Sequence, residues 1–248
     1  MATTDSPLDD HAFSAWLAEQ IGDTLLKVRT RDLDGKALKD AGDFEAQQVV
    51  AALLAEHRPD DAVLSEEAAD DKRRLTADRV WIIDPLDGTR EYSERPREDW
   101  AVHVALWQSG DLVAGAVAQP ALGETLSTAQ PPAVPDREAG APIRLAVSRS
   151  RASETVLTLA EAIGAELVPM GSAGVKVAAV IRGEVDAYLH TGGQYEWDSA
   201  APVAVARAAG LHTSRADGSP LRYNQPDVYL PDLLVCRPEL ADQILAAV

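Results

Sequence analysis

The sequence predicts an α/β fold whose first half is of the α+β kind, and two patterns indicate it. In residues 1–130, two stretches with apolar residues at helical spacing precede several short apolar runs, which predicts a helix pair and an antiparallel sheet. In residues 143–248, strand-like and helix-like segments alternate, as is typical of an α/β layer. Residues 131–142 contain four prolines and a glycine, and we expect a linker between the halves there.

Two helices are expected at the start of the chain. The first covers residues 11–28, where apolar side chains recur at helical spacing after the acidic Asp9 and Asp10. The second opens at Asp43, which by default is its N-cap, and ends near Pro59.

Short strands follow the helix pair. Residues 62–64 form a brief strand that leads into the acidic pair Glu66-Glu67, which on its own fits a solvated loop. Three apolar runs, at 100–107, 112–118 and 124–129, are separated by turn residues. This spacing predicts an antiparallel meander.

The second half alternates regularly between the two kinds of segment. Strands are expected over residues 143–147, 166–168, 185–189 and 233–236, and helices over 153–163, 176–182, 199–209 and the C-terminal residues.

Composition limits the classes of function. A chain of 248 residues with 46% hydrophobic and 25% charged residues is globular and long enough for one large domain or two small ones. Its net charge of −17 repels nucleic-acid polymers, so we expect no such partner. The same charge repels small phosphorylated substrates unless bound Mg²⁺ inverts the sign at the site. The acidity therefore favours a metal intermediary, although an acidic surface that only keeps a protein in solution explains it nearly as well.

The expected location is the cytoplasm, with no membrane partner. No apolar run has the length of a membrane span, and the first residues lack a basic-then-apolar signal pattern. The single Cys236 cannot form an internal disulfide, and its apolar neighbours predict a buried strand thiol. The five histidines have no zinc-site spacing and are interpreted as surface or core residues.

The most informative stretch runs from Val80 to Thr89. Four apolar residues predict a strand buried on both faces, and Pro85 should stop it after Asp84. Asp87 and the glycine after it form a turn, and Thr89 is expected to cap the next helix. Two carboxylates three residues apart, with a carbonyl between them, suit a hard divalent cation. Two isolated aspartates three residues apart are more often only part of a turn.

The longer string Asp84-Pro85-Leu86-Asp87-Gly88-Thr89 is far more specific, and it resembles the signature of the inositol monophosphatase superfamily, the Mg²⁺-dependent, lithium-sensitive phosphatases. Two further motifs match that family: the pair Glu66-Glu67 after a strand, and the run from Trp197 to Ala201 that opens a helix. Asp43 stands where the family has an aspartate, but relatives carry Val-Thr before it and this chain does not. The resemblance implies a layered α-β-α-β-α fold.

Several other stretches look like the CysQ-type bisphosphate nucleotidase branch, which removes the 3′-phosphate of 3′-phosphoadenosine 5′-phosphate. They are residues 147–150, 171–176, 183–188 and 196–201. The resemblance implies a small phosphorylated nucleotide as substrate and a role in sulfate assimilation. Without it, residues 171–174 fit a plain turn and Lys176 a surface lysine, although a helix N-terminus suits a second phosphate.

The resemblance also implies the site. Two or three Mg²⁺ would be held by Glu66, Asp84, the Leu86 carbonyl, Asp87 and Asp198.

The resemblance further implies catalytic and substrate contacts. Thr89, hydrogen-bonded to Asp43, would orient a water for in-line attack on phosphorus. The implied substrate contacts are Glu66, Leu86, Asp87, Gly88, Thr89, Ser148, Ser172, Lys176 and Asp198.

Other functions stay open at this point. One is an inositol or sugar monophosphatase of the same superfamily, and another is a module that binds phosphorylated nucleotides without turnover. A purely structural acidic protein is a further class. The expected state is a monomer or a homodimer.

Overall fold

The computed structural model describes residues 8–149 and 152–248, so Ser150, part of one nucleotidase-like motif, lies outside the described residues. The elements of the first half are α1 (Asp10–Arg29), α2 (Gly35–His57), β1 (Ala62–Ser65), β2 (Arg79–Asp87), α3 (Thr89–Ser93), β3 (Ala101–Gln108), β4 (Asp111–Gln119) and β5 (Glu124–Ser127). Those of the second half are β6 (Arg144–Ser148), α4 (Glu154–Ile163), β7 (Glu166–Met170), α5 (Ala173–Ile181), β8 (Ala187–Tyr195), α6 (Glu196–Ala208), β9 (His212–Ser214), β10 (Tyr229–Cys236) and α7 (Ala241–Leu245).

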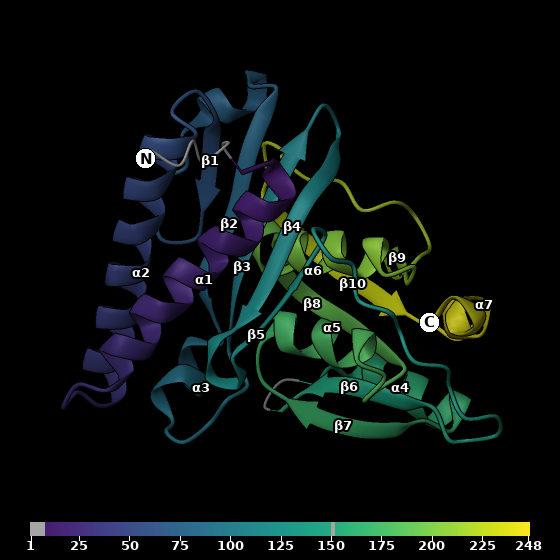
Figure 1. Ribbon diagram of the computed structural model, residues 1–248. Helices are drawn as coiled ribbons and strands as arrows, with labels where there is room; N and C mark the ends of the chain where they lie inside the picture. Colours follow the sequence, from purple (N-terminus) through teal and green to yellow (C-terminus); the bar gives the residue numbers. More distant parts are fainter. Residues whose placement is uncertain (1–7, 150–151) are drawn as a thin grey trace.

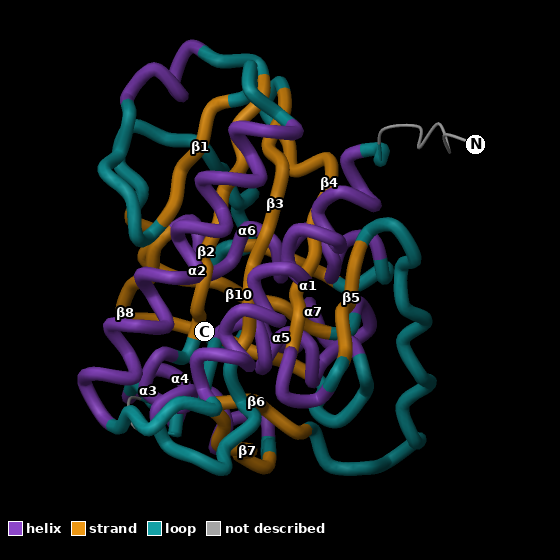
Figure 2. The backbone as a smooth tube through the Cα atoms, turned by 60° about the vertical axis from the view of Figure 1, so that its left-hand side comes forward, coloured by secondary structure: helices purple, strands orange, loops and turns teal. Residues whose placement is uncertain are grey.

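The helices and sheets form five layers, which confirms the predicted α/β class and the layered arrangement (Figure 1). One sheet has the strand order β1-β2-β3-β4-β5, in which β3, β4 and β5 form the predicted antiparallel meander and β2 also pairs antiparallel with β3. The other sheet has the order β7-β6-β8-β10-β9. Helices α1 and α2 cover the outer face of the first sheet, α5 and α6 lie between the sheets, and α4 and α7 cover the second sheet (Figure 2).

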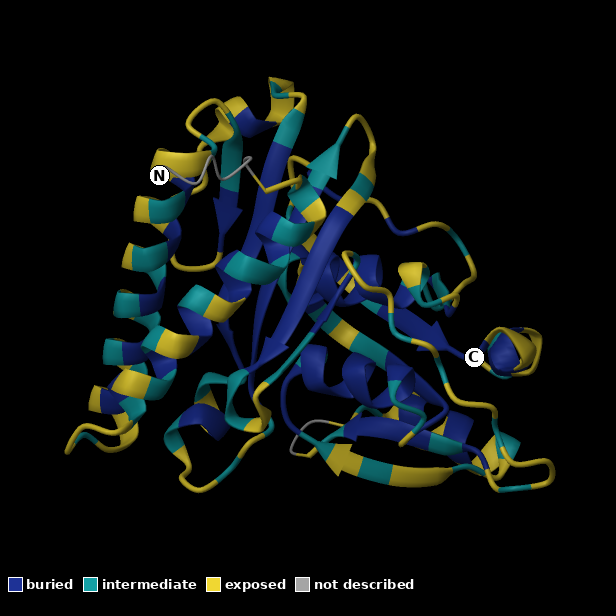
Figure 3. Ribbon diagram, in the orientation of Figure 1, coloured by how far each residue is buried: buried dark blue, intermediate teal, exposed yellow. Residues whose placement is uncertain are grey.

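Strand β2 shows why its sequence is apolar without alternation. Trp81 and Ile83 face the cluster under α1 and α2, whereas Val80 and Ile82 face the cluster that contains α5 and α6. All four side chains are fully buried. The strands of the first sheet are accordingly coloured as buried over most of their length (Figure 3). Because both faces of the sheet are covered, every residue of the strand is in a core.

The second sheet follows the same rule. Tyr188 and Val235 pack with α5 and α6, and their neighbours Leu189 and Leu234 pack toward α4 and α7. The central cluster therefore draws residues from both halves of the chain. None of the described helices is long and apolar enough to cross a membrane. Cys236 is buried and free, as predicted.

Helix α2 begins earlier than predicted. It starts at Gly35, with Asp34 in the N-cap position, so the expectation that Asp43 is the N-cap is wrong. The run from Lys36 to Lys39 consists of good helix formers, and Leu38 is fully buried on the inner stripe. The longer helix puts Asp43 in its interior.

Strand β2 also differs from its prediction. It does not stop at Asp84, because the pairing of β2 with β3 shifts register between Asp84 and Asp87. Pro85 lies in this bulge, where the ladder needs no donor from it. Gly88, at φ 84°, takes the N-cap position of α3, so Thr89 is the first helical residue and not the cap.

In the second half, five elements are longer than predicted and β9 was missed. Helices α5 and α6 begin before the predicted starts at residues 176 and 199, β7 and β8 continue to Met170 and Tyr195, and β10 begins at Tyr229. Gly192 and Gly193 resemble the end of a strand, but pairing with β10 stops at Thr191 and resumes at Gln194, so the two glycines form a bulge within β8.

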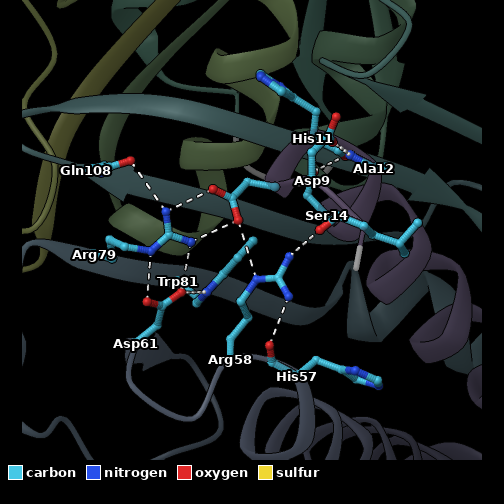
Figure 4. A network of polar contacts seen from close by, with 12 residues as sticks. Asp9, His11, Ala12, Ser14, His57, Arg58, Asp61, Arg79, Trp81 and Gln108 are labelled. Carbon is cyan, nitrogen blue, oxygen red and sulfur yellow. Dashed lines mark hydrogen bonds and ion pairs between the residues drawn. The ribbon is translucent and has the colours of Figure 1, made fainter. Parts of the chain in front are cut away.

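Ion pairs fix the first residue of β2 to α1 and to the short segment between α2 and β1. Arg79 binds Asp61 and Asp10, and the Trp81 indole donates to Asp61 at 2.8 Å (Figure 4). Arg58, at the end of α2, lies over the Phe13 ring of α1 at 4.1 Å. These contacts fix the end of β2 that lies away from Asp84 and Asp87.

A second buried ion group fastens the connection between the sheets. The Asp186 carboxylate is fully buried and accepts hydrogen bonds from Arg237 at 3.0 Å and from Arg144 at 3.3 Å. Arg237 also donates to the carbonyl of Pro135, within the irregular segment between β5 and β6. This segment is thus anchored through Asp186.

We expect Asp186→Ala to lower the free energy of unfolding by about 3–5 kcal/mol, because it leaves the buried Arg237 charge without a partner. Glu184→Gln is the control: its pair with Arg182 is half-exposed and should be worth less than about 1 kcal/mol. Urea unfolding of both variants measures the difference. Equal losses would show that Asp186 does not have this role.

Candidate active site

A cavity of about 750 Å³ lies where the two sheets approach each other. Its walls come from the bulged end of β2, the start of α3, the start of α5, the second half of β8 and the first turn of α6. The predicted site residues in this wall are Glu66, Asp84, Leu86, Asp87, Gly88, Thr89, Ser148, Ser172, Lys176 and Asp198.

Three carboxylates meet at this cavity. Asp84 and Asp87 come from the bulge of β2, and Asp198 comes from the first turn of α6. One oxygen of each lies within 4.8 Å of the others, and we call these three residues the acidic cluster. Asp198 also accepts the main-chain N–H of Tyr195 at 2.6 Å, which holds its side chain against the cavity wall.

Two members of the acidic cluster hold protons more tightly than an ordinary aspartate. Burial and the neighbouring charges of Glu66 and Asp87 raise the pKa of Asp84 well above its usual value. Burial and the Asp87 charge raise the pKa of Asp198 to about 6. At the cavity rim, the loss of solvent and the Asp198 charge raise the pKa of Glu66 to about 7, although its side chain keeps an exposed edge.

These shifts have one physical cause, which is negative charge gathered where water is scarce. A bound cation would remove that repulsion. Carboxylate and carbonyl oxygens are the ligands that Mg²⁺ prefers, so the donor set fits this metal.

Asp87 is the exception in the acidic cluster. Its Oδ2 accepts from the Ser172 hydroxyl at 2.5 Å and from the Gly174 N–H at 2.8 Å, and it lies 3.2 Å from His103 Nε2. Burial alone would raise its pKa, but His103 and these hydrogen bonds lower it to about 2. Asp87 therefore remains ionised, with Oδ1 left for a cation.

His103 is the site residue that the sequence interpretation missed. It is fully buried in β3, and its Nδ1 lies 3.1 Å from the carbonyl of Trp197. Both of its neighbours are acceptors, which favours the imidazolium, although the 3.2 Å contact of Nε2 with Asp87 is an ion pair and not an aligned hydrogen bond. Burial lowers its pKa, but the Asp87 carboxylate outweighs this effect and the pKa is raised. The available signal was a single histidine inside a continuous apolar run.

Ser172 and Lys176 have different surroundings from those expected. Ser172 Oγ accepts the Val175 N–H at 3.0 Å and so caps α5, while its proton goes to Asp87. Lys176 is only 5% exposed, which excludes the surface alternative. Its Nζ donates to the Ser172 carbonyl at 2.5 Å and lies 5.1 Å from the Tyr188 ring centroid. Burial lowers the pKa of Lys176.

Thr89 lines the cavity, whereas Asp43, in the interior of α2, is not among the residues that line it. The Thr89 hydroxyl donates its one proton to the Leu86 carbonyl at 3.1 Å, and the contacts described for it include no bond to Asp43. Burial, together with the charges of Glu67 and Asp40, raises the pKa of Asp43 to about 7.

Comparison with known proteins gives a consistent result. The model of the inositol monophosphatase family matches residues 11–248. The chain is 49% identical to a 3′-phosphoadenosine 5′-phosphate phosphatase of Mycobacterium leprae, over 97% of this chain and 94% of the relative. It is 31% identical to the 3′(2′),5′-bisphosphate nucleotidase CysQ of Escherichia coli K12, over 86% and 94%. A crystal structure of CysQ from Bacteroides thetaiotaomicron matches with a TM-score of 0.77 and 28% identity, over 91% and 96%.

The raised carboxyl pKa values predict a pH-dependent stability of the metal-free protein. The folded chain binds more protons than the unfolded chain between about pH 4 and 7, so stability falls as the pH rises through this window. Asp84→Asn removes one repelling charge and keeps an oxygen for the Leu86 N–H. We expect it to raise the melting temperature in chelator by a few degrees at pH 8, since 1 kcal/mol is worth about 2–4 °C in a chain of this size.

The gain should shrink towards pH 5, where the wild-type carboxyls are protonated. Asp23→Asn, on the exposed side of α1, is the control and should give no pH-dependent difference. A gain from Asp84→Asn that is the same at both pH values would contradict the repulsion described here.

Proposed function

This chain belongs to the inositol monophosphatase family and is an enzyme, and we propose that it removes the 3′-phosphate of 3′-phosphoadenosine 5′-phosphate in a Mg²⁺-dependent reaction. The observation that carries the proposal is the acidic cluster at a cavity that also contains the buried cation of Lys176. The names of the relatives from Mycobacterium leprae and Escherichia coli support the choice of substrate.

In this proposal, two or three Mg²⁺ are held by Glu66, Asp84, the Leu86 carbonyl, Asp87 Oδ1 and Asp198. When bound, Mg²⁺ supplies the positive charge that makes a coordinated water acidic and that stabilises the leaving oxygen. Asp87 is the best prepared of these residues, because its charge and orientation are already fixed by donors to its other oxygen.

Asp43 and Thr89 are the proposed catalytic residues. Asp43 acts through Thr89: it is the final acceptor of the proton that the attacking water loses, and a pKa of about 7 suits a general base at neutral pH. Thr89 Oγ1, held by the Leu86 carbonyl, orients that water for in-line attack on phosphorus. The N–H groups of Gly88 and Thr89, at the start of α3, have no intrahelical acceptor and hold the phosphate oxygens. No covalent phosphoenzyme is needed.

A bisphosphate has a second phosphate, and the cavity offers groups for it. Lys176 supplies a positive charge behind the N-terminus of α5, and Ser148 supplies a hydroxyl from the end of β6. Inositol monophosphate has no second phosphate for these residues to bind. The buried lysine therefore favours the nucleotidase over the inositol phosphatase of the same family.

The direct test is phosphate release from 3′-phosphoadenosine 5′-phosphate and from inositol 1-phosphate, measured side by side with Mg²⁺. We expect strong preference for the bisphosphate, loss of activity with chelator and inhibition by Li⁺. A preference for inositol 1-phosphate would keep the metal site but reject the substrate. Undetectable release from both, with tight nucleotide binding, would favour a binding module.

Two variants test the roles of single residues. Asp84→Asn should lower kcat at saturating Mg²⁺ by at least about 100-fold, because it removes charge that stabilises the transition state. Wild-type turnover of this variant would reject the metal scheme.

Lys176→Met should raise KM for the bisphosphate by about 10–100-fold, the range for hydrogen bonds to charged groups. Residual hydrolysis of inositol 1-phosphate is the control for folding. If both substrates suffer equally, Lys176 has a structural role only.

A further inference from the structure

An exposed aromatic surface lies at the rim of the cavity. Tyr195, the last residue of β8, lines the cavity and is 47% exposed. The other tyrosine of the lining, Tyr188, is only 2% exposed and is covered by the ammonium of Lys176. Tyr195 therefore offers a flat apolar surface among carboxylates, hydroxyls and main-chain groups.

The Tyr195 ring is held in position by two others. It stacks on Trp197 with centroids 4.9 Å apart and planes 18° from parallel. The Tyr229 ring meets it edge-on at 6.3 Å and 79°. Trp197 and Tyr229 do not line the cavity, so they support the Tyr195 ring from outside it. A supported ring of this kind loses little freedom when a ligand stacks on it.

The backbone is shaped to allow this arrangement. Gly193 has a φ of 89°, and a Cβ at this position would lie 2.0 Å from the Tyr229 hydroxyl. Only glycine lets the Tyr229 ring pack against β8 and reach the edge of Tyr195. Gly193 is thus required by the aromatic group, whereas a Cβ at Gly192 would meet no atom within 4 Å.

Tyr195 is also close to the proposed chemistry. Its main-chain N–H donates to Asp198 at 2.6 Å, so its side chain begins beside the acidic cluster. A base joined through one ribose to a phosphate at that cluster would reach the ring. Stacking accepts any base, since every base has a π-face, and it increases with the ring area that overlaps.

We propose that Tyr195, supported by Trp197 and Tyr229, is the surface on which the base of the nucleotide stacks. The proposal rests on the proposed function, because it deepens the substrate recognition of the same site. It assigns a base-binding role to a residue outside the phosphate and metal contacts. Purine nucleotides should bind better than pyrimidine nucleotides, with modest discrimination between purines.

The test uses Tyr195→Leu, Tyr195→Phe and the control Phe44→Leu. Phe44 is a 65% exposed aromatic residue on α2 that does not line the cavity. Calorimetry with AMP, which has no 3′-phosphate to hydrolyse, measures binding without turnover. We expect Tyr195→Leu to weaken AMP binding about 10-fold, a factor within the range for aromatic–base stacking. Tyr195→Phe and Phe44→Leu should bind AMP like the wild-type protein.

Kinetics separate stacking from a structural effect. Tyr195→Leu should raise KM for the bisphosphate about 10-fold with little change in kcat, and should leave hydrolysis of inositol 1-phosphate unchanged. Unchanged AMP binding in Tyr195→Leu would overturn the proposal, as would an equal loss on inositol 1-phosphate. A wild-type protein that binds AMP but does not hydrolyse the bisphosphate would reject the proposed function and leave the stacking surface standing.

Discussion

The position of one carboxylate oxygen, Asp87 Oδ2, constrains the whole molecule. Asp87 belongs to the first sheet, and its Oδ2 accepts hydrogen bonds from Ser172 and Gly174 at the N-terminus of α5. The same oxygen forms an ion pair with His103 of β3. Helix α5 lies between the two sheets, so these contacts fix how the second half of the chain meets the first. Trp197 extends the connection to α6 through its carbonyl, which holds the other side of His103.

The remaining charges of the site are far less satisfied. Asp84 and Asp198 lie close together in a dry environment, and their raised pKa values measure the free energy stored there. Such strain persists because the rest of the structure determines these positions independently. At the end of β2 that lies away from Asp84 and Asp87, Arg79 fixes the strand to α1 through Asp10 and to the segment after α2 through Asp61.

The sequence predicted most of the fold and the main acidic residues, because local patterns determine both. The bulge at Pro85 could not be predicted, since it depends on the register with β3. The start of α2 was missed because its first turns are polar and lack the periodic stripe used to find helices. The burial of Lys176 and the role of His103 arise from contacts between segments far apart in the chain. Tyr195 had no motif of its own, and its surroundings are formed by Trp197 together with Tyr229 from another strand.

Because Gly174 packs closely against His103, the residue types allowed at these two positions depend on each other. A Cβ at residue 174 would lie 2.0 Å from the His103 ring nitrogen, so no larger residue fits while the histidine is present. A smaller residue at 103 would vacate that volume and admit a side chain at 174. Across the family, substitutions at these two positions should therefore occur together, and a homologue with a larger residue at 174 should lack the imidazole and hold its Asp87 counterpart with fewer donors.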